Sequence, residues 1–346
     1  MILLGKTLSE LQTVAQSVGL PKFAGKQLAE WLYIRRVRTF DEMTNISLKG
    51  REKLKANYTI GRHAPVANIE SKDGTVKYLF QVDSNYVEAV YIPEEDRSTL
   101  CVSTQIGCKM GCRFCMTGTL GFHGQLSAAD ILNQVFEIDD ILTKQHQCAI
   151  TNLVLMGEGE PMDNLEYVLQ ALEVLTSDYA CAWSPKRITV SSVGLIAGLK
   201  RFIEESECHL AISLHNPFAA ERELIMPAQK AWPIGEVIAL LEQYDWSHQR
   251  RLSFEYICWQ DNTTPRHAKE LLRLLHNLSC RVNLIRFHEG VEQDSKSQVF
   301  KPVTLETMTW FRDYLSARGL TTTIRKSRGE DILAACGMLV NALQKS

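Results

Sequence analysis

The sequence predicts an α/β protein: a partial barrel of six β/α units, preceded by a small helical domain and a β-hairpin extension. Three observations predict this fold. From residue 99 onward, short apolar runs alternate with segments of helical periodicity, which is typical of a parallel sheet covered by helices. Six units are fewer than the eight of a closed barrel. The first 62 residues show only helical periodicity. A doubly wound sheet is the alternative arrangement.

The predicted domains are residues 1–62, 63–98 and 99–346. The first contains three predicted helices and carries eleven Lys or Arg but only five Asp or Glu, although the whole chain has a net charge of −2. A basic module on an acidic body is typical of proteins that bind a polyanion such as RNA. A solvated helical surface is the alternative. Trp31 and Tyr33 could stack on RNA bases, which is one hypothesis for these aromatic residues. The other hypothesis is that they belong to the core of the helical domain.

The remaining elements follow in order. A turn at residues 83–85 joins two alternating segments, 76–82 and 86–93, which predict a hairpin. The predicted barrel strands are 99–104, 152–156, 188–193, 210–214, 252–258 and 282–287. Predicted helices cover 127–142, 165–172, 195–205, 237–244, 268–278 and 305–317. An appended strand at 321–325 and a terminal helix from about Asp331 complete the chain.

Three cysteines follow the first barrel strand as C-x3-C-x2-C: Cys108, Cys112 and Cys115. Gly111 allows a tight turn between them. Three thiolates can hold three irons of a cubane cluster and leave the fourth iron open, whereas iron–sulfur proteins usually supply four cysteines. A zinc knuckle is the alternative, but zinc sites favour paired C-x2-C units, and the sequence has no second one. The pattern therefore favours a reactive iron–sulfur cluster.

Polar residues also follow the next three strands, where the active site of such a fold lies. They are the segments Gly157-Glu158-Gly159-Glu160-Pro161, Ser191-Ser192 and Ser213-Leu214-His215-Asn216. A carboxylate there can accept hydrogen bonds from an ammonium group, and hydroxyls or an imidazole can bind ribose or carboxylate. Each segment alone fits a plain turn, but together they predict a pocket.

Spacing alone gives the other cysteines no chemical role. Cys101, Cys148, Cys181, Cys208, Cys258, Cys280 and Cys336 fit buried structural residues, and Glu88 fits a solvent-facing acid on an alternating strand. No apolar run reaches the length of a membrane span. The amino terminus does not fit a signal peptide, and ten cysteines then fit a reducing compartment, so the sequence predicts a cytoplasmic protein.

The chain resembles the RlmN/Cfr family of RNA adenine methyltransferases within the radical S-adenosylmethionine superfamily. The matching segments are VEAVYIP, GCKMGCRFCMTG, MGEGEP, RITVSSVG, LAISLHNP, FEYI, NLIRF and IRKSRGEDILAACG, in family order. The resemblance implies a radical S-adenosylmethionine barrel. It also implies methylation of C2 of an adenosine in 23S rRNA and in a tRNA, with an electron donor such as flavodoxin and a monomeric enzyme.

The resemblance also implies individual roles. Cys108, Cys112 and Cys115 would ligate a 4Fe-4S cluster that binds S-adenosylmethionine. Gly159, Glu160, Ser191, Ser213, Leu214 and His215 match positions that hold this cofactor. Cys336 matches the cysteine that is S-methylated. A 5′-deoxyadenosyl radical removes hydrogen from that S-methyl group, and the resulting carbon radical adds to adenine. Cys101 matches the cysteine that resolves the adduct through a transient disulfide, and Glu88 matches the proton acceptor.

Two positions depart from the family pattern. His288 stands where Asn is usual, and we expect it to make the same cofactor contact, while Glu158 stands where Met or a similar residue is common.

The alternative functions are C8 methylation of the same rRNA adenosine, a radical enzyme acting on a small molecule, and a non-catalytic RNA-binding protein with a structural metal. The segment GEP and the full basic N-terminal domain favour C2.

Overall fold

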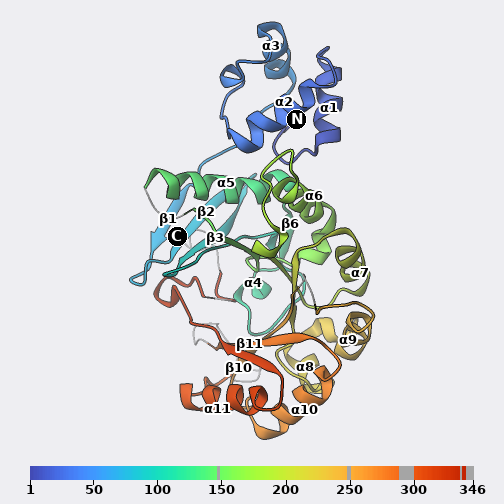
Figure 1. The fold of residues 1–346 in the computed structure, drawn as a ribbon. Helices are drawn as coiled ribbons and strands as arrows, with labels where there is room; N and C mark the ends of the chain where they lie inside the picture. Colours follow the sequence, from blue (N-terminus) through green and yellow to red (C-terminus); the bar gives the residue numbers. More distant parts are fainter. Residues whose placement is uncertain (146–148, 248–250, 288–299, 336, 340–346) are drawn as a thin grey trace.

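The structure is a computed structural model, and it describes residues 1–145, 149–247, 251–287, 300–335 and 337–339. A helical region at the amino end lies on top of a larger body built on one long sheet (Figure 1). Within the described ranges, no helix is both long enough and apolar enough to cross a bilayer.

The helical region contains α1 (Leu8–Ser17), α2 (Ala24–Ala29) and α3 (Leu48–Asn57). A π-helical turn, η1 (Glu30–Ile34), extends α2, and a 3-10 turn, η2 (Phe40–Glu42), precedes α3. Trp31 and Tyr33 lie in η1 with side chains that are almost fully buried. The hypothesis that they stack on bases is therefore wrong, because both rings belong to the core of this region.

The main sheet contains ten strands in the order β1-β2-β3-β4-β7-β8-β9-β10-β11-β12. Strands β1 to β4 pair antiparallel, and β4 to β12 pair parallel. Because the parallel strands follow one another in chain order without a reversal, the sheet curls into a partial barrel and is not doubly wound. The bounds are β1 (Ala67–Glu70), β2 (Val76–Val82), β3 (Asn85–Pro93), β4 (Ser98–Cys101), β7 (Asn152–Leu155), β8 (Ile188–Ser192), β9 (His209–Ser213), β10 (Leu252–Cys258), β11 (Cys280–Arg286) and β12 (Thr321–Ile324).

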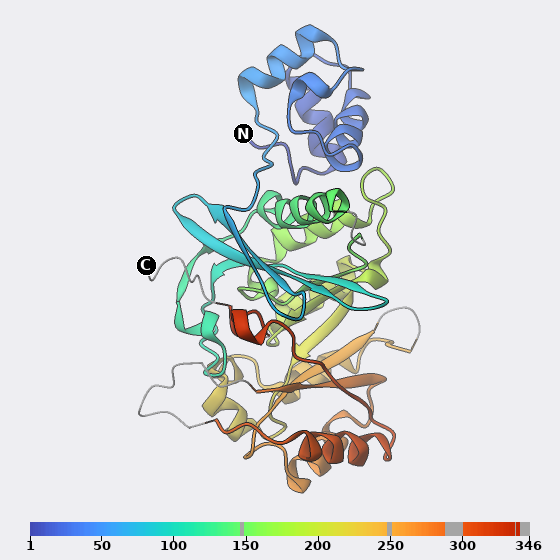
Figure 2. The same cartoon turned by 90° about the vertical axis from the view of Figure 1, so that its left-hand side faces the viewer.

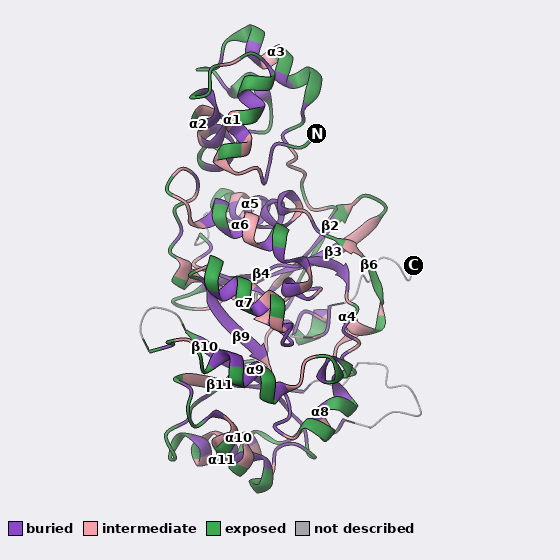
Figure 3. Ribbon diagram, turned by 90° about the vertical axis from the view of Figure 1, so that its right-hand side faces the viewer, coloured by how far each residue is buried: buried purple, intermediate pink, exposed green. Residues whose placement is uncertain are grey.

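Helices cover the outer face of the sheet, and their apolar sides are buried against it (Figure 3). Ser127 caps α5 through a reciprocal pair of hydrogen bonds with Asp130, as the sequence predicts. The bounds are α5 (Ala128–Lys144), α6 (Leu165–Thr176), α7 (Ile196–Glu205), α8 (Ala219–Ile225), α9 (Ile234–Leu241), α10 (Pro265–Leu275) and α11 (Leu305–Ser316), with the 3-10 turns η3 (Pro161–Asn164), η4 (Pro185–Arg187) and η5 (Pro227–Lys230).

The segment after β4 forms a small unit of its own. It consists of β5 (Gln105–Gly107), the cysteine loop, α4 (Met116–Thr119) and β6 (Phe122–Gln125), with β5 and β6 paired antiparallel. The first barrel strand, β4, is therefore shorter than the predicted strand, because the chain leaves the main sheet after Cys101.

The hairpin prediction is confirmed, and β1 adds a third antiparallel strand to it.

The predicted terminal helix from about Asp331 is wrong within the described residues. A single 3-10 turn, η6 (Glu330–Ile332), ends at Leu333, whose φ of +53° cannot continue a right-handed helix. Instead of bonding along a helix, the backbone after Leu333 bonds to α4, which directly follows the cysteine loop. The Met116 N–H donates to the Gly337 carbonyl at 2.8 Å, and the Thr117 hydroxyl donates to the Leu339 carbonyl at 3.1 Å. Figure 2 shows η6 beside the hairpin extension.

Ion pairs attach the amino-terminal region to α5. Arg36 lies 2.7 Å from Asp139, and the buried Arg62 lies 2.8 Å from Glu137 and 2.7 Å from Asp140. These arginines belong to the basic excess that the sequence shows. Part of that excess therefore neutralises carboxylates inside the molecule.

Candidate active site

A cavity of about 110 Å³ lies at the carboxyl ends of the barrel strands, and it contains eight of the residues that the sequence predicts for the site. Leu214 does not line it. Its side chain is fully buried in the core, and its N–H donates to the Glu255 carbonyl at 3.1 Å. His288 and Cys336 lie outside the described residues. The eight lining residues are Cys108, Cys112, Cys115, Gly159, Glu160, Ser191, Ser213 and His215.

The cysteine loop is shaped by glycines. Gly111 has a φ of +63°, which a residue with a side chain adopts only under strain. A Cβ atom at Gly118 would lie 2.9 Å from the Cys112 carbonyl oxygen, so only glycine allows α4 to approach the loop this closely. The loop is thus held with its thiols toward the cavity.

The three thiols lie where a thiolate is unfavourable without a bound cation. Burial raises the pKa of Cys108 to about 12 and raises the pKa of Cys112 well above its ordinary value. Burial also raises the pKa of Cys115. Metal binding requires deprotonated thiols, and bound iron supplies the positive charge that stabilises them. Three thiols around one cavity, one buried and two partly buried, with no fourth on the same loop, fit a cluster that keeps one iron open.

The loop after β7 forms the side of the cavity next to the cysteines. Gly159 has a φ of +100°, and a Cβ atom there would lie 2.5 Å from the side chain of Gln105. This close approach lets the side-chain amide oxygen of Gln105 accept from the Glu160 N–H at 2.7 Å. The Glu160 carboxyl in turn accepts from the Val193 N–H at 2.8 Å. The loop therefore ties β5, β7 and β8 together at the edge of the cavity.

His215 is held as a neutral imidazole. Burial, with a smaller contribution from the charge of Arg222, lowers its pKa to about 3. Its Nδ1 accepts from the Ile257 N–H at 3.1 Å, which leaves the proton on Nε2. The ring lies edge-on to Phe114 with centroids 4.6 Å apart. The histidine is thus fixed in ring orientation and tautomer.

Glu158 has a structural role that its departure from the family pattern did not reveal. Its side chain is almost fully buried, and its two oxygens accept from the N–H groups of Glu88 at 2.9 Å and Gly107 at 3.2 Å. Burial raises its pKa to about 8. The carboxyl group joins the hairpin extension to the strand that enters the cysteine loop.

Glu88 is not the solvent-facing acid that its alternating strand suggests. Only 2% of its surface is exposed, and its carboxylate lies 3.1 Å from the Lys77 ammonium group on the neighbouring strand β2. Lys77 is also buried and donates to the Leu333 carbonyl at 3.4 Å. Sequence reasoning missed Lys77. A lysine alternating with apolar residues in a strand was a signal, but an exposed face gives the same pattern.

Cys101 packs with the carboxyl-terminal segment. It contacts a small cluster of buried residues that includes Val90, Ala334 and Leu339. Ala334 and Leu339 flank the position of Cys336 in the sequence. Cys101 therefore lies beside the segment that carries the other cysteine to which the resemblance gives a role.

Arg222 is a second residue that sequence reasoning missed. Its side chain is fully buried and donates to the carbonyls of Val193 and Ser213, each at 2.9 Å, and to the Gln229 side chain at 2.6 Å. Burial lowers its pKa to about 10. The guanidinium group thus connects the carboxyl ends of β8 and β9 and places a positive charge beside the thiols.

Comparisons with known proteins agree along the whole chain. Residues 1–60 match the family described as the ribosomal RNA large subunit methyltransferase N-terminal domain. A relative from Bacteroides fragilis, described as a probable dual-specificity RNA methyltransferase RlmN, is 58% identical over 99% of this chain and 97% of its own length. The dual-specificity RNA methyltransferase RlmN of Syntrophobacter fumaroxidans is 40% identical over 96% of each chain. The crystal structure of a radical SAM methyltransferase from Sphaerobacter thermophilus matches with a TM-score of 0.89 and 35% identity, over 98% of each chain.

Proposed function

Since this chain belongs to the RlmN family of RNA methyltransferases, we propose that it methylates C2 of an adenosine in 23S rRNA and of a tRNA adenosine, through an S-methylcysteine at Cys336. Family membership makes it an S-adenosylmethionine-dependent RNA methyltransferase. The relatives that support C2 are described as dual-specificity enzymes, which fits two RNA substrates. Neither a non-catalytic RNA-binding protein nor a small-molecule enzyme fits these relatives.

One observation supports the mechanism: the segment that follows Cys336 in the sequence is bonded to α4, which directly follows the cysteine loop. The Gly337 and Leu339 carbonyls accept from the Met116 N–H and the Thr117 hydroxyl. When bound, a 4Fe-4S cluster and S-adenosylmethionine supply the 5′-deoxyadenosyl radical that such chemistry needs. Cys108, Cys112 and Cys115 would hold the cluster, and Gly159, Glu160, Ser191, Ser213 and His215 line the cavity where the cofactor would bind.

The chain's own residues would then complete the transfer. The Glu88 carboxylate takes the C2 proton of adenine, and the Lys77 ammonium group at 3.1 Å keeps that carboxylate ionised and oriented. The Cys101 thiolate attacks the sulfur of Cys336, so that an S–S bond forms as the bond from that sulfur to the transferred carbon breaks. The released carbon takes a proton and becomes the methyl group of the base. This step requires two sulfurs within bonding reach. Adenine C2 is too weak a nucleophile for polar transfer from a sulfonium, which is why this cysteine route is needed.

The reaction also indicates its partners. An electron donor such as flavodoxin would reduce the cluster, and the enzyme would act as a cytoplasmic monomer on rRNA and tRNA. His288 would contact the cofactor in place of the usual Asn.

The experiment that tests the cysteine route uses anaerobically reconstituted enzyme and an rRNA fragment. Cys336→Ala is expected to abolish RNA methylation, while Cys101→Ala is expected to leave a covalent protein–RNA adduct that denaturing gels show as a slow band. Cys280→Ala, at a half-buried cysteine away from the cavity, is the matched control and should retain activity. Full product formation by Cys336→Ala would contradict the mechanism.

A further inference from the structure

A network of side-chain hydrogen bonds joins the cysteine loop to the loop after β7. Gln105, in β5, lies at its centre and is fully buried. Its side-chain oxygen accepts from the Glu160 N–H at 2.7 Å. Its side-chain nitrogen donates to the Gln125 side-chain oxygen at 2.8 Å and to the Asp163 carboxylate at 2.7 Å. The Gln105 amide therefore uses its oxygen and both of its N–H groups.

These partners allow only one orientation of the Gln105 amide. A backbone N–H can only donate, so the amide oxygen has to face Glu160. The amide nitrogen then faces two acceptors, one of which is the Asp163 carboxylate. Turning the amide over would place N–H against N–H and oxygen against a carboxylate, and unsatisfied groups of this kind are costly inside a protein. Gln105 thus holds the backbone of Glu160 in one position.

At its other end, the network reaches the residue that follows Cys108. The Lys109 ammonium group lies 2.8 Å from the Asp163 carboxylate and 4.6 Å from the centroid of the Phe122 ring. The Gln125 side chain also donates to the Asp163 carbonyl at 2.8 Å. Asp163 therefore connects the cysteine loop, β6 and the 3-10 turn η3.

Among the described residues around the cavity at the three cysteines (the cysteine cavity), Glu160 is the one that belongs to this network. Its carboxylate accepts from the Met162 N–H at 3.0 Å and from the Val193 N–H at 2.8 Å. Together with the bond from its own N–H to Gln105, these contacts hold both the backbone and the side chain of Glu160.

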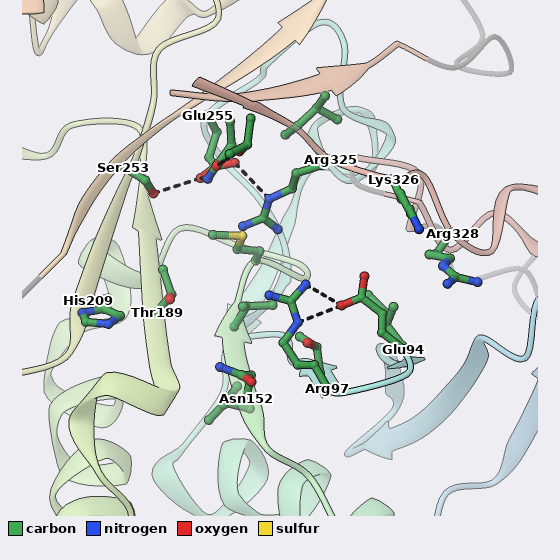
Figure 4. A pocket seen from close by; sticks show the side chains of 18 of the residues that line it. Glu94, Arg97, Asn152, Thr189, His209, Ser253, Glu255, Arg325, Lys326 and Arg328 are labelled. Atoms are coloured by element: carbon green, nitrogen blue, oxygen red, sulfur yellow. Dashed lines mark hydrogen bonds and ion pairs between the residues drawn. The ribbon is translucent and has the colours of Figure 1, made fainter. Parts of the chain in front are cut away.

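The network stays outside a second, larger cavity. This cavity has a volume of about 510 Å³, and Figure 4 shows side chains that line it. It adjoins the cysteine cavity, because Met156, Glu255 and Ile285 line both. Of the described residues around it, none belongs to the network. Any effect of Gln105 on a bound molecule therefore passes through Glu160 and its neighbours.

We propose that Gln105 and Asp163 are positioning residues for S-adenosylmethionine. They hold Glu160 at the cysteine cavity and connect it, through Lys109, to the loop that carries the three thiols. The resemblance gives both loops a contact with this cofactor. Loops that are already fixed relative to each other lose less free energy when a ligand binds to both. This inference rests on the cofactor site of the proposed function.

The test measures equilibrium binding of S-adenosylmethionine to the anaerobically reconstituted enzyme, expressed per cluster. Gln105→Met removes the amide but keeps the length of the side chain, and it is expected to raise the dissociation constant about tenfold. Gln170→Met is the matched control, because Gln170 is half-buried on α6 and donates to the Glu10 carboxylate at 2.7 Å. The control should bind as the wild type does. Equal affinity of the two variants would overturn the inference.

A double variant tests whether these residues act as one network. Lys109→Met, at a partly exposed side chain, removes the ion pair with Asp163 and is expected to raise the dissociation constant about two- to threefold. Combined with Gln105→Met, it should add nothing further, because the connection to Glu160 is already lost. A further loss of the same size in the double variant would show that Lys109 acts independently, which contradicts the network.

Kinetics distinguish positioning from a general loss of structure. The KM of Gln105→Met for S-adenosylmethionine should rise about tenfold, while kcat for methylation of the rRNA fragment falls at most about twofold, because saturating cofactor compensates for weaker binding. A lower kcat with an unchanged KM would overturn the inference. A wild-type enzyme that binds the cofactor but does not methylate RNA would overturn the proposed function instead, and the binding comparison would still decide the inference.

Asp163→Asn serves if Gln105→Met fails to fold, because Asp163 is only half-buried. The substitution removes the charge that pairs with Lys109 and is expected to raise the dissociation constant for S-adenosylmethionine about threefold. Wild-type affinity in Asp163→Asn would overturn the inference.

Discussion

Two buried cations hold the functional side chains in place. Arg222 bonds to the carbonyls that end β8 and β9, and Lys77 pairs with Glu88 beneath the carboxyl-terminal segment. Each also bonds to a polar side chain: Arg222 donates to Gln229 at 2.6 Å, and Lys77 lies 3.1 Å from the Glu88 carboxylate. Each therefore fixes the position of particular groups: Arg222 fixes the two strand ends, and Lys77 fixes the Glu88 carboxylate. A hydrophobic residue of similar size could not form these bonds.

Arg222→Met is expected to destabilise the protein. The substitution leaves several buried carbonyls without donors, and a buried unsatisfied group costs about 1–3 kcal/mol, so we expect a loss of about 3 kcal/mol or more in unfolding free energy. Denaturant unfolding of the protein would measure it. Arg201→Met, which removes an exposed ion pair on α7, is the control and should leave the unfolding midpoint nearly unchanged.

Lys77→Met is expected to slow methylation at least tenfold at neutral pH, because the buried Glu88 would lose the ammonium group that favours its ionised form. Activity should return as the pH rises, since a carboxyl group that ionises less readily needs a higher pH. Rate profiles between pH 6 and 9 would show this shift, and Lys77→Arg should restore much of the neutral rate. If Lys77→Met combined with Glu88→Gln is much slower than Glu88→Gln alone, Lys77 does not act through Glu88.

At the residue scale, motif reasoning identifies the groups that touch the cofactor but not those that position them. The three cysteines and the strand-end residues are recognisable because their spacing is itself the signal. Lys77, Arg222 and the bridging role of Glu158 depend on contacts between strands far apart in the sequence, such as the 70 positions between Glu88 and Glu158. No local pattern distinguishes a buried charge of this kind from an exposed one.

Among the elements, the loop after β7 depends on one glycine. Gly159→Ala is expected to lower the unfolding free energy by about 1–3 kcal/mol, because the residue has a positive φ and its Cβ would collide with Gln105. Gly235→Ala, in helix α9 with nothing within 4 Å, should instead be neutral or stabilise by up to about 1 kcal/mol. Equal effects of the two substitutions on denaturant unfolding would contradict the packing argument.

The contact between α5 and the amino-terminal region should weaken in acid. Burial alone would raise the pKa of Asp140, but hydrogen bonds and charges from Arg62 and Arg36 lower it below the ordinary value of 3.8. A lowered folded-state pKa contributes stability that is present above the unfolded value and is lost as the pH falls through the folded value.

The melting temperature between pH 7 and pH 3 measures this contribution. Asp140→Asn is expected to melt below the wild type at pH 7, and the difference should begin to shrink only as the pH falls below about 4. Asp178→Asn, at an exposed carboxylate, should follow the wild-type curve. A constant difference between Asp140→Asn and wild type at every pH would show that the carboxylate charge contributes nothing.

Elements with strong local patterns are predictable, and elements defined by tertiary bonding are not. The strand from Leu252 to Cys258 and the first hairpin strand have the predicted bounds, because their apolar runs end in clear turn signals. The prediction of a terminal helix fails because Leu333 adopts a left-handed conformation and the carbonyls of Gly337 and Leu339 accept hydrogen bonds from α4. Those partners lie about 220 residues away, so local propensity could not reveal them.

Two adjoining cavities lie inside one barrel. The cysteine cavity lies at the carboxyl ends of the strands, and a second cavity, whose lining includes Lys186, Arg251 and Arg281, extends toward their amino ends. The barrel order follows from the repeated β/α units in the sequence. The closure of the barrel by the hairpin extension and the carboxyl-terminal segment required the structure, because it rests on long-range contacts such as Ser71 to Asp331.

We propose that this enzyme methylates C2 of adenosine in RNA through Cys336. The most direct measurement is mass spectrometry of nucleosides from 23S rRNA and tRNA after incubation with the reconstituted wild-type enzyme. We expect 2-methyladenosine in both RNAs with the wild-type enzyme and none with Cys336→Ala. Only 8-methyladenosine, or 2-methyladenosine from the Cys336→Ala enzyme, would contradict it.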